Sequence, residues 1–488
     1  MTTSPASSSA SPPNLKRPKS LAIALRGTSE LPPPRVFPHN FNMSSTNGRQ
    51  LADHICRILR DRGHQAYLAG GCVRDILLGR EPVDYDVATN ATPDRVQELF
   101  PNSLAVGAKF GVVIVTDGPT QVEIATFRRD VSYTDGRHPD RVEYASTPQE
   151  DVKRRDFTIN GLMLDPFSNE VLDFVGGEKD LRAGIIRAIG NPEDRFREDK
   201  LRMIRAVRFA ARFRYEIESS TFIAITKLAP DIFQVSAERI RDELTKILTE
   251  GAARRGFELL DETKLLLEIL PEIARMKGVA QPPQFHPEGD VWIHTLLMIE
   301  QLKPGCSPTL AWGVLLHDVG KPPTFTPPSG PDSRIRFDRH VEVGAKMAEE
   351  ICRRLRFSND DTAQIVALVA NHLRFKDVGQ MKLSTLKRFV RLNHFEEHLE
   401  LHRLDCLSSH RNLSAYDFVQ RFLAETSAEQ VRPPRLLTGE DLKALGYPPG
   451  PRFKEILAAL EDAQLNGTIH SREEALRLIR DNFTASHG

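Results

Sequence analysis

The spacing of apolar residues changes along the chain, and the change falls near residue 193. Before it, short apolar runs alternate with polar residues and predict strands at 66–69, 83–88, 111–116 and 121–127. The same part carries an amphipathic helix at 49–62 and a second helix that follows Gly70 and Gly71. This pattern predicts an α+β unit with a small mixed sheet.

After residue 193 the apolar residues recur every three or four positions, which is typical of amphipathic helices. Proline-rich segments interrupt the pattern at 281–287, 322–331 and 433–451. We therefore expect an all-helical remainder, with helices near 195–213, 219–228, 236–250, 253–268, 290–302, 309–317, 340–355, 360–372, 384–410 and 452–464.

Composition sets the first 46 residues apart, because they are rich in serine and proline and contain a single acidic residue, Glu30. Such a segment cannot bury a core, and we expect residues 1–46 to be disordered. A targeting segment, a passive tail and an over-extended start with initiation near Met43 are all compatible with this composition.

The charge, the apolar runs and the cysteines of the chain exclude some classes of protein. Lys and Arg total 66 and Asp and Glu total 66, so any nucleic-acid binding must come from a local basic patch. No apolar stretch approaches the roughly 20 residues that span a bilayer. The five cysteines form no paired motif, which fits a cytoplasmic protein in a reducing compartment.

Two short segments carry candidate chemistry in the first part. LAGGCVRDILLG at 68–79 places two glycines between a strand and a helix, where backbone N–H groups can approach a phosphate. In VDYDVA at 83–88, Asp84 and Asp86 would share one face of a strand, and a divalent cation would relieve their repulsion. A pair of solvated edge-strand aspartates is the alternative. Glu123, in a neighbouring alternating strand, is a candidate third carboxylate or a solvent-facing residue.

Four motifs occur in order: GGCVRD, DYD, RRDFTINGL at 154–162 and EDKLRMIRAVRFAAR at 198–212. Together they resemble the bacterial class II tRNA nucleotidyltransferase and poly(A) polymerase family, the CCA-adding enzymes, over roughly residues 65–250. The resemblance implies a polymerase-β-type nucleotidyltransferase head followed by helical neck, body and tail regions. It also implies that Asp84 and Asp86 hold Mg²⁺. By the same resemblance, Gly71, Arg74 and Arg155 contact the nucleotide triphosphate.

The resemblance further places Asp199, Arg202, Arg205 and Arg208 on a nucleotide-selecting helix. Asp199 and Arg202 are three residues apart, so on a helix they would share a face. A carboxylate only accepts hydrogen bonds and a guanidinium only donates them, a pattern that matches cytosine and adenine but not uracil or guanine. A plain surface ion pair is the alternative. Residues 195–214 hold eight basic and two acidic residues, a net charge of +6, and form the candidate basic patch.

Histidines and aspartates recur on the apolar helices between 285 and 410, and such side chains are suitable ligands for a divalent metal. The set resembles the HD superfamily of metal-dependent phosphohydrolases. The implied ligands, with a second divalent transition metal, are His294, His317, Asp318, His340, His372 and Asp405. An active site of this kind would hydrolyse 2′,3′-cyclic or terminal phosphates on RNA ends, with Lys321 as a phosphate contact. A scaffold that has lost activity is the alternative.

We therefore expect a nucleotidyltransferase that adds CMP and AMP from CTP and ATP to tRNA 3′ ends. The expected domains are a head at 47–190, a neck and body for nucleotide selection and RNA binding at 191–280, an HD domain at 281–420 and a helical tail at 421–488. Three rivals remain open at this point. They are a poly(A) polymerase or partial CC- or A-adding enzyme, a protein whose main activity is the HD phosphohydrolase, and a catalytically dead RNA-binding protein.

Overall fold

The structure is a computed structural model that describes residues 47–105, 111–131, 141–284, 286–330 and 334–483. The proposed N-terminal extension lies outside these residues. Among the described helices, none is long and apolar enough to cross a lipid bilayer.

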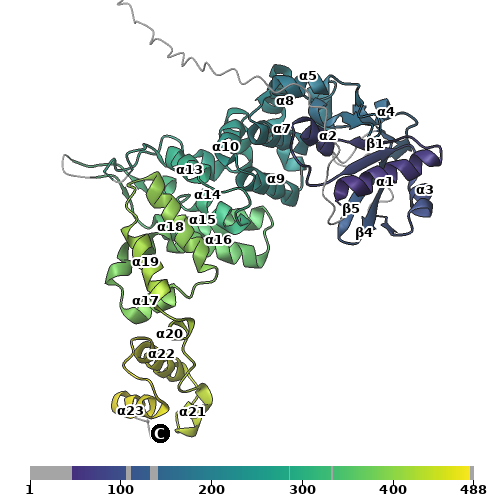
Figure 1. The fold of residues 1–488 in the computed structure, drawn as a ribbon. Coiled ribbons are helices and arrows are strands. Elements are labelled where there is room, and N and C mark those ends of the chain that lie inside the picture. The colour runs from purple at the N-terminus through teal and green to yellow at the C-terminus, as the bar shows by residue number, and fades with distance from the viewer. Residues whose placement is uncertain (1–46, 106–110, 132–140, 285, 331–333, 484–488) are drawn as a thin grey trace, which may run out of the picture. The chain divides into compact units, whose positions relative to one another are not determined.

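A seven-stranded mixed sheet forms the core of the head (Figure 1). Its central strands β1 (Ala66–Ala69) and β2 (Asp86–Thr89) pair antiparallel, and β2 pairs parallel with β5 (Thr120–Thr126). The strand order is β3-β4-β5-β2-β1-β8-β9, where β3 is Ser103–Leu104, β4 Val112–Asp117, β8 Leu162–Leu164 and β9 Val171–Asp173. The predicted α+β class with a small mixed sheet is confirmed.

Short helices lie between and beside these strands. They are α1 (Gly48–Asp61), α2 (Gly71–Leu77), α3 (Pro93–Leu99), α4 (Pro148–Lys153) and α5 (Gly177–Ala183). Leu51, Ile55 and Leu59 of α1 are buried, as the amphipathic pattern predicts, and α1 packs on β1, β2 and β5. In a separate two-stranded sheet, β6 (Arg128–Val131) pairs antiparallel with β7 (Arg141–Tyr144).

Helices dominate the remainder of the described chain. The neck and body contain α6 (Pro192–Glu198), α7 (Leu201–Phe213), α8 (Ser219–Leu228), α9 (Ala237–Thr249), α10 (Ala253–Glu262) and α11 (Leu265–Ile269). The next group contains α13 (Val291–Glu300), α14 (Pro308–Leu316), α15 (His340–Arg354), α16 (Asn359–Asn371), the 3₁₀ segment η5 (His372–Gln380), α17 (Leu383–Phe389) and α18 (Phe395–Ser408). The last elements are α19 (Ser414–Glu425), α21 (Gly439–Ala444), α22 (Pro451–Leu465) and α23 (Arg472–Asn482). The tail has a hydrophobic core of its own, which includes Leu442, Ile456 and Ile479.

Several predicted helices are divided in the structure. The helix predicted over 195–213 is broken at Asp199, which has an extended backbone (φ −144°, ψ 104°) and separates α6 from α7. The helices predicted over 253–268 and 384–410 are broken at Lys264 (φ 66°) and His394 (φ 44°), two left-handed residues. Apolar spacing continues across each break, so periodicity alone could not reveal it.

The strand predicted over 83–88 begins only at Asp86, so the prediction that Asp84 and Asp86 share one strand face is wrong. Asp84 lies in a bend before β2, and it is exposed. Pro82 has no N–H to donate to a ladder, and Val83 is 87% exposed.

Candidate functional site

A tight turn joins β1 to α2 and brings the backbone close to two charged side chains. Gly70 has φ 76° and ψ −129°. A Cβ at this position would lie 2.8 Å from Nη1 of Arg155 and 3.9 Å from Oδ2 of Asp86. Glycine is needed here both for the backbone conformation and for the room it leaves.

Three carboxylates gather near the start of β2. Asp86 is its first residue and lies opposite Glu123 in the parallel register with β5. Burial, Glu123 and Asp84 raise the pKa of Asp86 to about 6, although Arg155 acts in the opposite direction. This mutual destabilisation of negative charge fits a divalent cation held by Asp86 and its neighbours.

A hydrogen-bonded chain runs from Arg74 to Arg205 through residues of the RRDFTIN segment. Nη1 of Arg74 donates to Oδ1 of Asn160 at 2.7 Å, and Nδ2 of Asn160 donates to Asp156 at 3.0 Å. Arg205 donates to the other Asp156 oxygen at 2.7 and 3.0 Å. Burial opposes ionisation of Asp156, but Arg205 and Asn160 outweigh it and lower the pKa to about 2. Asp156 is therefore a fixed anion that orients the cations around it.

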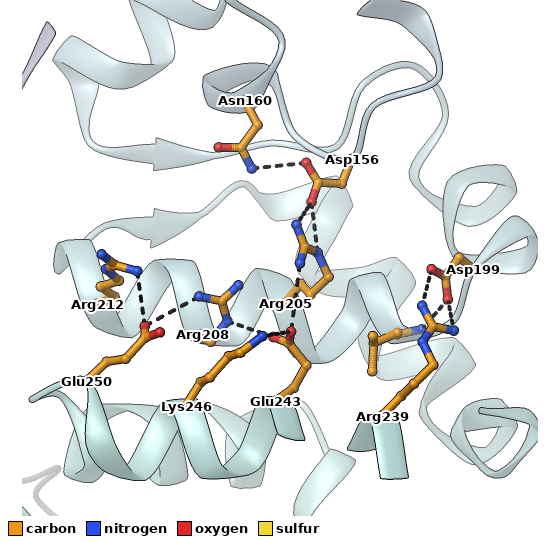
Figure 2. Close-up of polar contacts among 11 residues, drawn as sticks. Asp156, Asn160, Asp199, Arg205, Arg208, Arg212, Arg239, Glu243, Lys246 and Glu250 are labelled. Carbon is orange, nitrogen blue, oxygen red and sulfur yellow. Dashed lines mark hydrogen bonds and ion pairs between the residues drawn. The ribbon is translucent and has the colours of Figure 1, made fainter. Parts of the chain in front are cut away.

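The arginines of α7 face acidic residues of α9 (Figure 2). Arg208 contacts the buried Glu243 at 2.6 Å, and Arg205 lies 3.7 Å from the same carboxylate. Arg208 and Arg212 also pair with Glu250 at 3.4 and 3.3 Å. The predicted basic patch is therefore partly neutralised by the adjacent helix, a feature that the local sequence of 195–214 does not reveal.

Asp199 and Arg202 do not form the helical i,i+3 pair that was predicted. Asp199 lies in the break before α7, and both of its carboxylate oxygens accept hydrogen bonds from Arg239 of α9, at 2.8 and 3.2 Å. Arg202 donates to Glu198 at 3.0 Å and to the carbonyl oxygens of Arg154 and Arg195. Each side chain is instead held separately by its own partner.

These groups nevertheless line one cavity of about 540 Å³. Eight of the predicted site residues border it: Gly71, Arg74, Asp86, Arg155, Asp199, Arg202, Arg205 and Arg208. Asp156, Asn160 and Arg239 also line it and were not assigned from the sequence. Asp84 and Glu123 are not part of its lining and act on it through Asp86.

The histidines of the second predicted site are oriented by backbone carbonyls. Nδ1 of His317, His340 and His372 lies 2.7–2.8 Å from the carbonyl oxygen three residues earlier in each case. Because a carbonyl oxygen only accepts, these Nδ1 atoms carry a proton, and Nε2 is the ring nitrogen left to bind a metal. All three Nε2 atoms are buried without a hydrogen-bond partner among the described residues.

Asp318 lies at the centre of this cluster. One of its oxygens is 3.0 Å from Nε2 of His317, and the other is 3.9 and 3.8 Å from Nε2 of His340 and His372. His294 completes the set, with Nε2 3.2 Å from Asp405. Burial would lower the pKa of His294, but Asp405 and Glu288 raise it to about 9. Imidazole nitrogens beside carboxylates are a donor set that a divalent transition metal prefers.

The possible ligand atoms of the six residues form two groups. Within each group, all ligand atoms lie within 4.8 Å of one another. One group is His294, His317 and Asp405, and the other is Asp318, His340 and His372. The six residues predicted from the sequence are therefore brought together, although they come from five separate helical segments. A third group joins His294 to His286 and Glu288, which the sequence reading missed.

Gly320 allows the turn that carries Asp318 to pack closely against the start of α15, which carries His340. A Cβ at this position would overlap the carbonyl oxygen of His340 and lie 2.6 Å from the backbone nitrogen of Gly344. The turn that carries Asp318 therefore packs directly against the first turns of α15.

Three family models match separate parts of the chain. A model described as the poly A polymerase head domain matches residues 66–187. A probable RNA and SrmB-binding site of polymerase A matches residues 214–277, and an HD domain matches residues 291–393.

Curated relatives cover the chain to different extents. The CCA-adding enzyme of Levilactobacillus brevis is 31% identical over 430 residues, which is 88% of this chain and 96% of that protein. The CCA-adding enzyme of Leuconostoc mesenteroides is 44% identical over 43% of this chain, and the match spans only 52% of that protein. Poly(A) polymerase I of Salmonella typhi is 41% identical over 44% of this chain and 49% of its own length.

Among solved structures, the CCA-adding enzyme of Bacillus stearothermophilus in complex with CTP is similar over 90% of this chain and 98% of that one, with a TM-score of 0.66 and 26% identity. The Thermotoga maritima CCA-adding enzyme complexed with tRNA shares the fold, with a TM-score of 0.54 and 19% identity. The chain therefore belongs to the bacterial tRNA nucleotidyltransferase and poly(A) polymerase family, whose members include the CCA-adding enzymes.

Proposed function

We propose that the protein adds CMP and AMP, from CTP and ATP, to the 3′ end of tRNA in the cytoplasm. The observation that carries this proposal is the single cavity that joins Asp86 to Arg74, Arg155, Asp199 and Arg202. Four of the five relatives and solved structures named above are CCA-adding enzymes, which supports the same activity, and the fifth is a poly(A) polymerase. All five cysteines are free, which fits a reducing compartment.

The reaction joins the terminal ribose oxygen of the RNA to the α-phosphorus of the nucleotide. The bond from that phosphorus to the bridging oxygen breaks, pyrophosphate leaves, and the hydroxyl proton passes to solvent. Arg74 and Arg155 bind the triphosphate, because guanidinium groups match phosphate oxygens in charge and geometry. Asp84 and Asp86 would hold Mg²⁺, which supplies charge neutralisation and lowers the pKa of the attacking hydroxyl when it is bound.

Asp199 and Arg202 have unused hydrogen-bonding capacity that suits them to select a base. Two carboxylate oxygens offer about four acceptor positions. On Asp199, Arg239 uses two of them and the backbone N–H of Leu201 uses a third. Arg202 has five N–H donors, of which three are engaged. The remaining acceptor and donor positions suit the amino group and ring nitrogen of cytosine and adenine.

The ion pair between Arg239 and Asp199 leads to a prediction about specificity. Replacing Arg239 by alanine should lower the ratio of kcat/KM for CTP over UTP by about tenfold, because Asp199 would lose its fixed orientation, a loss of about 1.4 kcal/mol. Single-nucleotide incorporation on a tRNA that lacks its last three residues measures this ratio.

The charge-conserving variant Arg239→Lys should recover part of the discrimination, while the Kd for tRNA stays unchanged in both variants. Equal losses of kcat/KM for CTP and UTP would contradict a positioning role, since they would indicate general damage to the cavity.

A product analysis tests the main proposal against its nearest rivals. Transcripts of one tRNA that end before the first C, after one C and after both are incubated with each labelled nucleotide separately. We expect C, C and A to be added in order, with no extension from UTP or GTP. Long A tails would instead identify a poly(A) polymerase, and arrest after CC or addition of A alone would identify a partial enzyme.

A second function is favoured by the unpartnered nitrogens of the histidine cluster. We propose that His294, His317, Asp318, His340, His372 and Asp405 hold a divalent transition metal, and that this site hydrolyses 2′,3′-cyclic or terminal phosphates on RNA ends. In the cyclic case, a water oxygen bonds to phosphorus, one ribose ester bond breaks, and the water proton passes to the released ribose oxygen. The bound metal supplies Lewis acidity and lowers the pKa of the attacking water.

Lys321 supports this chemistry from beside the cluster. Its Nζ donates to Asp318 at 2.7 Å and to Gln281 at 2.6 Å, and it is buried. A fixed positive charge at this place would offset the negative charge that develops on a phosphate during hydrolysis.

A further inference from the structure

A cavity of about 480 Å³ opens above the histidine cluster. Asp318, His340, His372 and Asp405 line it, together with Lys321. Another part of the lining comes from residues 334–338, which include strand β13 (Arg336–Phe337) and pair with β12 (Phe325–Thr326). Four of the proposed metal ligands therefore border a cavity, and residues 334–338 form another part of its wall.

Two arginines of this wall, Arg334 and Arg336, differ from the arginines of the nucleotide cavity in their ion pairing. Arg74, Arg155, Arg205 and Arg208 each pair with a carboxylate in the structure. Arg334 and Arg336 are exposed and have no ion-pair partner among the described residues. Residues 334–338 also include Asp338, so the net charge of the wall is only +1. Within the wall, the guanidinium groups of Arg334 and Arg336 are therefore the positions that can bind an anion.

The wall also offers an aromatic surface. Phe337 lines the cavity, its ring centroid is 5.4 Å from Nζ of Lys321, and the ring of Phe325 lies 5.9 Å away. Aromatic rings beside arginines are a common way of holding an unpaired nucleotide, since the base stacks and the phosphate meets the cation.

We propose that Arg334 and Arg336 bind the phosphodiester next to the terminal phosphate of an RNA, so that the HD site selects RNA ends over free nucleotides. This inference rests on the proposed hydrolase function. The cluster would engage the phosphate to be cleaved, and the wall would engage the preceding one. A mononucleotide has no phosphate at the second position and gains nothing from the arginines.

The double variant Arg334→Ala/Arg336→Ala tests this assignment with two matched substrates. The first is cytidine 2′,3′-cyclic phosphate, and the second is a trinucleotide that ends in the same cyclic phosphate; both are hydrolysed with added Mn²⁺. Arg353→Ala is the control, because Arg353 is an exposed arginine near the far end of α15 from His340 and does not line the cavity.

For the double variant we expect KM for the trinucleotide to rise by about tenfold, the size of one charged hydrogen bond. KM for the mononucleotide should change by less than about twofold, and kcat should be unchanged for both substrates. The slope of log KM for the trinucleotide against log salt should fall by about 0.7, the value for one phosphate of a single strand. Arg353→Ala should match the wild type throughout.

Equal increases of KM for both substrates, or no increase for either, would overturn the assignment. Fluorescence anisotropy with a labelled trinucleotide that ends in a 2′-phosphate gives a readout that needs no turnover. If the wild type hydrolyses neither substrate, the hydrolase function fails. Even then, equal anisotropy for the wild type and the double variant would separately overturn the role of the arginines.

Discussion

Replacing Asp86 by asparagine should lower the rate of nucleotide addition by at least about a thousand-fold, because the variant loses a charged metal ligand at the reacting phosphate. The Kd for tRNA should stay within about twofold, since Asp86 lies at the start of β2 and carries no positive charge for RNA. Single-turnover incorporation of CMP, with tRNA binding measured in parallel, gives both quantities.

The same substitution has an expected effect on stability that serves as an internal control. The raised pKa of Asp86, about 6, means that the folded protein binds its proton more tightly than the unfolded chain, whose value is near 3.8. Without metal, Asp86 therefore costs stability as pH rises through this window. Asp86→Asn should unfold at a higher temperature than the metal-free wild type at pH 8, and the advantage should disappear below about pH 4.

Asp117→Asn, at the exposed end of β4, provides the matched control and should behave like the wild type in every assay. Full nucleotide addition by Asp86→Asn would refute the assignment of this carboxylate to the metal.

Asp318→Asn should abolish phosphohydrolase activity while nucleotide addition remains at the wild-type rate. Asp318 is the residue whose two oxygens face both groups of histidines, at 3.0 Å from His317 and 3.8–3.9 Å from His340 and His372. Removing its charge should therefore weaken metal binding at both groups and lower hydrolysis by about a thousand-fold or more. Elemental analysis of protein loaded with Mn²⁺ and then desalted measures the bound metal directly.

The matched control is Asp377→Asn, an exposed aspartate of η5 five residues after His372. Together, Asp86→Asn and Asp318→Asn should each remove one activity and spare the other. A loss of both activities in either variant would indicate unfolding or a shared site, and unchanged metal content in Asp318→Asn would contradict its role as a ligand.

Motifs whose chemistry is local could be predicted from the sequence. The turn at Gly70 and Gly71, the carboxylate of Asp86 and Arg155 of the RRDFT segment lie around one cavity, as their order along the chain implied. The six HD residues also converge. His294, His317 and Asp318 lie on or directly after α13 and α14, two strongly apolar helices whose burial the sequence pattern indicates. Their roles in catalysis stay predictions.

Interactions between distant segments could not be predicted in this way. Arg239 pairs with Asp199 across 40 residues of sequence, and Glu243 pairs with Arg208 across 35. The break at Asp199 is invisible to periodicity, yet it turns that carboxylate toward α9. Glu288 contacts His294 from a loop, and a loop has no periodicity to mark it. In each case the partner is fixed by tertiary packing.

The close contact at Gly320 has an evolutionary consequence, because it could allow one of the two proposed activities to be lost while the other is kept. Because no side chain fits between this residue and α15, the smallest possible enlargement, a single methyl group, would push His340 away from Asp318. The residues that line the nucleotide cavity include none from this turn or from α15. In a lineage, the proposed phosphohydrolase activity could therefore be lost through a change of one codon, and the proposed nucleotide addition would be retained.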